Sequence, residues 1–240
     1  MQNRKTLSFE TLKNDKLFVV AIALSLGLVI LFHLASAWFG YPLYRDIHLG
    51  AAVDYAQNGI DLWRPVIIGF TANGAPTPQE FPLWQAWAAL FIQLFGGWLG
   101  AANIASLLIF LLCLYPMYRI GRLEFDLKIA LWVLLAVILQ PMVFVTGGRA
   151  STEILGFFSS IVFIWTSLEY WKNPRWLWLP LMVAGAVLAA LVKAPFLFSV
   201  GATAAIYLVL QWRWEPKLWL VLVVTGIFSL FLFFLWTRHT

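Results

Sequence analysis

Charged residues are scarce in this sequence. They make up 11% of its 240 residues, whereas hydrophobic residues make up 62% and the mean hydropathy is +0.84. A soluble domain carries about 25% charged residues, so this composition excludes a surface covered by water. The chain is expected to be an integral membrane protein.

Sequence signatures of many enzyme classes are also missing. The single cysteine, Cys113, lies within an apolar run, which excludes a disulfide framework and a cysteine-based metal cluster. The sequence has no Walker loop, no hydrolase nucleophile elbow and no dinucleotide fingerprint. It also has no internal repeat, which disfavours a transporter or flippase built from inverted halves around a midplane site.

The net charge of +5 does not indicate a nucleic-acid partner. The 16 Lys and Arg are scattered at the ends of apolar runs rather than gathered in one patch. Basic residues in that position interact with anionic lipid headgroups. We therefore expect a lipid bilayer as a partner, and no nucleic acid.

Long apolar runs are what the chain has in abundance. A membrane-crossing helix needs about 20 apolar residues, and continuous apolar runs predict helices rather than the alternating strands of a barrel. The predicted fold class is all-α, a polytopic transmembrane helix bundle of about seven spans in a single membrane domain over 1–240. The first span is too long for a signal peptide and is expected to be retained. The expected spans are 17–39, 100–118, 129–146, 154–170, 176–192, 196–211 and 218–236.

An eighth apolar segment, 81–97, is expected to lie along the membrane surface. It is short, opens with Phe81-Pro82 and is rich in tryptophan, which is typical of the headgroup boundary. If it does not cross, the N-terminus and the segments 119–128, 172–175 and 213–217 share one side. That side then holds eleven of the 16 Lys and Arg, and the positive-inside rule makes it cytoplasmic. A short true span is the alternative.

The polar stretch 41–79 then faces the opposite side. It follows the first span, in an outer loop over 40–99 that contains short amphipathic interfacial helices. Long ordered loops are often functional. We expect a multi-pass protein of a bacterial inner membrane, with a cytoplasmic N-terminus and a periplasmic loop. Because nucleotide sugars are absent there, chemistry in this loop needs a donor delivered through the membrane.

Asp46 is the main catalytic candidate in this loop. A carboxylate at the membrane surface can act as general base toward an acceptor hydroxyl or amine; the alternative is an ordinary ion pair with Arg45. The next residues predict an amphipathic surface helix that ends at Asn58-Gly59. Asp54 is expected on the solvated face of that helix.

No cofactor follows from the sequence with certainty. His48 could join Asp46 as a metal ligand, but two ligands are too few to define a metal site. A divalent metal requirement stays an open alternative.

A second group of polar residues is expected on the same outer side. Arg149 and Glu153 are four residues apart, so they could form a helical ion pair, or the guanidinium of Arg149 could hold a lipid phosphate. Lys193 interrupts an apolar run before Pro195, and a lysine inside a membrane is a functional candidate by default. Together these residues predict a site for a phosphate-bearing lipid.

The order of these elements resembles the GT-C glycosyltransferases, and most closely their protein O-mannosyltransferase and aminoarabinose transferase group. The resemblance covers roughly 17–236, the seven-span module of that family. The residues that carry it are Asp46, Ala51, Ala56, Gly59, Pro65, Glu80-Phe81-Pro82-Leu83, Leu94-Phe95-Gly96, Arg149 with Glu153, and Lys193-Ala194-Pro195.

The resemblance implies an inverting glycosyltransferase that uses a polyprenyl-phosphate-linked sugar and a glycan, lipid or protein acceptor. It implies that Asp46 is the catalytic base and that Arg149 and Lys193 hold the donor phosphate. Glu80 would line the same cavity, with His48 and Glu153 as further substrate-binding residues.

Three departures from the family pattern leave an alternative open. Ile47 follows Asp46 where relatives often have a second acid, and Glu80 stands where they often have a lysine. Relatives also usually continue well beyond this length, so the chain is expected to be a fragment or a module that needs a partner. The alternative is a non-catalytic protein that binds polyprenyl lipid or assists a larger assembly.

Overall fold

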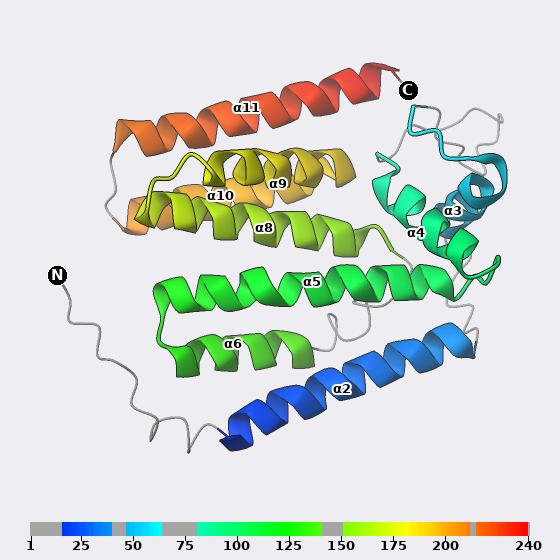
Figure 1. Ribbon diagram of the computed structural model, residues 1–240. Coiled ribbons are helices and arrows are strands. Elements are labelled where there is room, and N and C mark those ends of the chain that lie inside the picture. The colour runs from blue at the N-terminus through cyan, green and yellow to red at the C-terminus, as the bar shows by residue number, and fades with distance from the viewer. Residues whose placement is uncertain (1–15, 40–46, 64–80, 141–150, 212–214, 240) are drawn as a thin grey trace.

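The computed structural model describes residues 16–39, 47–63, 81–140, 151–211 and 215–239, and all regular secondary structure in these ranges is helical (Figure 1). Four helices, α2, α5, α8 and α11, are long and apolar enough to cross a membrane, and α4, α6, α9 and α10 are shorter apolar helices. The predicted class, an all-α polytopic membrane protein, is therefore confirmed. The helices are α2 (Lys16–Trp38), α3 (Ile47–Asn58), α4 (Leu83–Leu94), α5 (Ala101–Glu124), α6 (Leu127–Leu139), α8 (Glu153–Lys172), α9 (Trp178–Val192), α10 (Ala194–Leu210) and α11 (Pro216–His239).

The long helices lie side by side, and the two short helices α3 and α4 lie together at one end of the bundle (Figure 1). Helix α5 packs against α2, α6 and α8, while α9 packs against α8, α10 and α11. We call the end that carries α3 and α4 the α3–α4 end, and the opposite end, where α5 passes into α6, the α5–α6 end.

Most helix boundaries agree with the sequence, and the differences have local causes. Helix α5 continues beyond the expected limit of 118 to Glu124, because its charged last turn pairs with α8 and α10 rather than ending the helix. Helix α6 ends at Leu139, well before the expected limit of 146. Gln140 is extended, as expected for a residue that precedes a proline.

Helices α8 and α9 approach closely because small residues separate them. Gly185, Ala186, Ala189 and Ala190 are buried on α9. A Cβ atom added at Gly185 would lie 2.9 Å from the backbone nitrogen of Phe163 on α8. Helices in membranes associate largely through such close van der Waals packing, so the α8–α9 pair depends on the absence of a side chain at this position.

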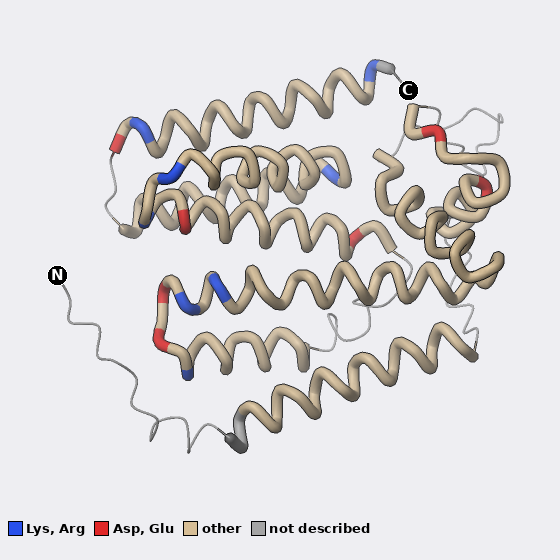
Figure 2. Tube along the Cα trace, in the orientation of Figure 1, with Lys and Arg blue, Asp and Glu red and all other residues tan. Residues whose placement is uncertain are grey.

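The charges lie at the two ends of the bundle, and the long helical segments between them are nearly free of charge (Figure 2). At the α5–α6 end, Glu169 accepts hydrogen bonds from Arg119 Nε at 3.0 Å and from Trp165 Nε1 at 3.1 Å. Glu124 pairs with Lys172 Nζ at 2.8 Å and accepts from the Tyr207 hydroxyl at 2.9 Å. This network joins α5, α8 and α10.

We expect Gly185→Val to destabilise the fold by about 1–3 kcal/mol, because the added side chain forces α8 and α9 apart. The matched control is Gly27→Val on α2, where a Cβ atom would meet nothing within 4 Å. The free energy of unfolding of the purified protein in detergent micelles measures both effects. Equal unfolding free energies for the two variants would contradict the close-packing argument.

Candidate functional site

The break between α9 and α10 places a cation at the α3–α4 end. Lys193 is the only residue between these helices, and its backbone is extended, with φ −158° and ψ 124°. Pro195 follows in the first turn of α10, where its missing N–H costs no hydrogen bond. The predicted interruption at Lys193 is confirmed.

The ammonium of Lys193 pairs with the first residue of α8. Lys193 Nζ lies 2.7 Å from Glu153 Oε1, and both side chains are partly exposed. Glu153 also accepts a hydrogen bond from the hydroxyl of Ser151. Residues 40 positions apart in sequence are thereby joined at one end of the bundle.

Helices α3 and α4 add a second polar pair at this end. Gln85 Nε2 lies 2.9 Å from His48 Nδ1. An amide nitrogen can only donate, so Nδ1 of His48 accepts in this contact. His48 also interacts electrostatically with Glu153, which places the His48–Gln85 pair beside the Lys193–Glu153 pair.

Helix α4 is fixed against its neighbours. Trp84 Nε1 donates to Ser106 Oγ at 3.0 Å, and Trp87 Nε1 donates to the carbonyl oxygen of Ala105 at 3.1 Å, both on α5. The backbone nitrogen of Phe81 donates to the carbonyl oxygen of Leu191 on α9 at 3.0 Å. These bonds hold Gln85 rigidly relative to α5 and α9.

Tyr55 on α3 is a structural donor at this end. Its hydroxyl donates to the carbonyl oxygen of Asp61 at 2.8 Å. Burial, with smaller contributions from Asp61 and Asp54, raises the pKa of Tyr55 to about 12. The phenol therefore stays protonated at neutral pH and is unsuited to act as a base.

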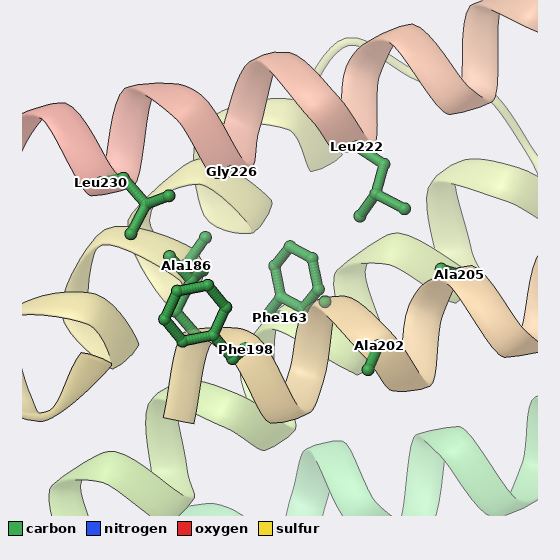
Figure 3. A pocket seen from close by; sticks show the side chains of 10 residues that line it. Phe163, Ala186, Phe198, Ala202, Ala205, Leu222, Gly226 and Leu230 are labelled. Atoms are coloured by element: carbon green, nitrogen blue, oxygen red, sulfur yellow. The ribbon is translucent and has the colours of Figure 1, made fainter. Parts of the chain in front are cut away.

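An apolar cavity of about 390 Å³ lies between α8, α9, α10 and α11. It starts at Leu197 and Phe198, one helical turn along α10 from Lys193. Figure 3 shows Ala202 and Ala205 of α10 on one side of it and Leu222, Gly226 and Leu230 of α11 on the other. The cavity therefore lies in the apolar part of the bundle and comes within one helical turn of Lys193 along α10.

The structure brings three of the predicted site residues together, namely His48, Glu153 and Lys193. Asp46, Glu80 and Arg149 lie outside the described residues, so their roles stay predictions. Among the residues that the structure does describe, no three His, Cys, Asp or Glu side chains are grouped as metal ligands.

Gln85 was not predicted as a site residue. Its signal in the sequence is a polar residue on the apolar face of a helix, because Gln85, Ala88, Ala89 and Ile92 are all buried and follow helical spacing. Ser151 and Thr152 were not predicted as individual site residues either.

Comparison with known families decides the class of protein. The sequence pattern of the dolichyl-phosphate-mannose-protein mannosyltransferase family matches residues 77–236, two-thirds of the chain. The chain belongs to this family. It is therefore an integral membrane protein and a glycosyltransferase of the GT-C type, as the sequence predicted. No curated protein and no solved structure matches the chain.

Proposed function

We propose that this glycosyltransferase moves a sugar from a polyprenyl-phosphate carrier to a glycan, lipid or protein acceptor at the α3–α4 end of the bundle. The observation that carries the proposal is the Lys193–Glu153 pair beside His48 and Gln85, with an apolar cavity starting one turn away. A cation next to an apolar cavity suits an amphiphile with a phosphate head and an isoprenoid tail.

The distribution of basic residues supports a periplasmic or equivalent outer location for this end. In the described helices and turns, the α3–α4 end carries Lys193 and Arg238, and the α5–α6 end carries many more basic residues. Cytoplasmic ends of spans are enriched in Lys and Arg. The proposed topology has seven spans, α2, α5, α6, α8, α9, α10 and α11, with α4 on the outer surface. The basic residues of the α5–α6 end are Arg119, Arg122, Lys128, Lys172, Arg175 and Lys217.

In the proposed reaction Asp46 takes the proton of the acceptor nucleophile as that nucleophile attacks the anomeric carbon. The new glycosidic bond forms while the bond from the anomeric carbon to the phosphate oxygen breaks. The departing polyprenyl phosphate keeps the bonding electron pair. Lys193 and Arg149 stabilise the charge that develops on this phosphate, and a single displacement inverts the anomeric centre.

Single-cysteine labelling tests the proposed orientation. In a Cys113→Ala background, we expect Gln57→Cys to react with a membrane-impermeant maleimide in intact cells, because the exposed end of α3 faces outward. Arg175→Cys, exposed between α8 and α9, should react only after lysis. The reverse labelling pattern would overturn the orientation.

Replacement of the proposed base tests the chemistry. We expect Asp46→Asn to reduce kcat for sugar transfer from polyprenyl-phosphate mannose by about 100-fold or more, as the loss of general base catalysis typically does. Donor binding should be retained, because the amide keeps the size of the carboxyl group.

Asp54→Asn is the matched control, since Asp54 follows eight residues later in the sequence on α3, and its carboxylate accepts a local hydrogen bond from Asn58 at 2.7 Å. Normal transfer by Asp46→Asn would rule out Asp46 as the base. Lipid binding without transfer by the unaltered chain would instead favour the accessory, non-catalytic alternative.

Filling the cavity tests the proposed place of the isoprenoid tail. We expect Gly226→Leu to raise the KM for the polyprenyl-phosphate donor several-fold with little change in kcat, because the added side chain occupies cavity volume. Gly27→Leu on α2 is the control; a Cβ atom meets open space at both glycines. An unchanged KM for Gly226→Leu would show that the tail binds elsewhere.

A further inference from the structure

Two buried polar atoms at the α3–α4 end have no hydrogen-bond partner in the described structure. They are Oε1 of Gln85 and Oγ1 of Thr152. Gln85 is 5% exposed and Thr152 is 1% exposed, so bulk water does not reach them freely. A buried polar atom without a hydrogen-bond partner destabilises the fold, and such an atom calls for an explanation.

Neither side chain has a structural role that explains its polar atom. Thr152 occupies the position before α8, yet its hydroxyl makes no capping hydrogen bond. Gln85 uses its amide nitrogen to contact His48 Nδ1. This contact fixes the orientation of the amide, so the carbonyl oxygen points away from His48.

Both atoms belong to the polar site already described. Thr152 lies between Ser151 and Glu153 in the chain, and these two residues are hydrogen-bonded to each other. Gln85 holds His48, which interacts electrostatically with Glu153. One core cluster, which includes Ala52, Trp84, Ile154 and Val192, supports this end of α3, α4, α8 and α9.

The chemistry of the two atoms selects the kind of ligand. The carbonyl oxygen of Gln85 can only accept a hydrogen bond, so a fully charged phosphate oxygen cannot satisfy it. The hydroxyl of Thr152 both donates and accepts. A group that presents several hydroxyls, which donate and accept together, satisfies both atoms.

We propose that Gln85 Oε1 and Thr152 Oγ1 bind hydroxyl groups of the transferred sugar, while Lys193 faces the phosphate of the same donor. This assignment rests on the proposed function and adds two sugar-binding residues to it. His48 is a positioning residue in this arrangement, because its Nδ1 determines which side of the Gln85 amide faces the sugar.

Binding of two lipids to variants tests the assignment. The probes are polyprenyl-phosphate mannose and sugar-free polyprenyl phosphate, each titrated against the purified chain in detergent. We expect Thr152→Val to weaken binding of the mannose-bearing lipid about three- to tenfold, the worth of one hydrogen bond. Binding of the sugar-free lipid should be unchanged. Gln85→Met should give the same pattern.

Ser167→Ala is the matched control. Ser167 lies on α8, its hydroxyl is fully buried, and that hydroxyl also has no partner in the described structure. Removing it deletes the same kind of group far along the helix from Glu153, so binding of both lipids should be unchanged. The unfolding temperature of Thr152→Val should not fall, because no hydrogen bond of the free protein is lost.

Four outcomes would overturn the assignment. If Thr152→Val weakens binding of both lipids equally, the Thr152 hydroxyl contacts the phosphate or the tail rather than the sugar. If Thr152→Val and Gln85→Met both bind the mannose-bearing lipid normally, the proposed sugar contacts are rejected. The proposed function is left intact if the unaltered chain still transfers sugar normally. A lowered unfolding temperature would indicate a structural hydroxyl. Failure of the unaltered chain to bind either lipid would reject the proposed function as well.

Discussion

The ion pair between Lys193 and Glu153 is the interaction on which the α3–α4 end depends. It joins the first residue of α8 to the single extended residue between α9 and α10. An unpaired charge at the edge of an apolar bundle is costly, so each of these residues stabilises the position of the other. The start of α8 is thereby joined to the break between α9 and α10, one helical turn from the cavity residues Leu197 and Phe198.

The two ends of the bundle use polar residues differently. At the α5–α6 end, the carboxylates of Glu169 and Glu124 pair with Arg119 and Lys172 between α5 and α8. This pattern fastens helices together. At the α3–α4 end, Gln85 and Thr152 keep buried polar atoms that no described residue satisfies, as Ser167 also does farther along α8, and Thr152 directly precedes Glu153 of the ion pair. Natural proteins keep unsatisfied buried polar atoms mainly where a ligand or a water molecule supplies the missing hydrogen bond.

The sequence predicted what depends on local pattern. Continuous apolar runs predicted the helices, and Lys193 before Pro195 predicted the break, because proline favours a helix start and a lysine within an apolar run must reach a polar partner. The partner itself could not be predicted. Helical spacing gave the Arg149–Glu153 pair only as one of two alternatives, and the described cation beside Glu153 is Lys193, 40 residues away. Gln85 was missed for the same reason, since its contact with His48 spans 37 residues.

The contacts of the described side chains also bear on which residue can act as base. The carboxylate of Glu153 accepts from Lys193 and Ser151. Nδ1 of His48 accepts from Gln85, and the Tyr55 hydroxyl is a committed donor to Asp61. These groups are therefore engaged in orienting one another, which suits binding and positioning more than proton transfer. A base drawn from the polar segment between α2 and α3 would leave this network intact during catalysis, which is consistent with the proposed role of Asp46, the residue directly before the first residue of α3 in the sequence.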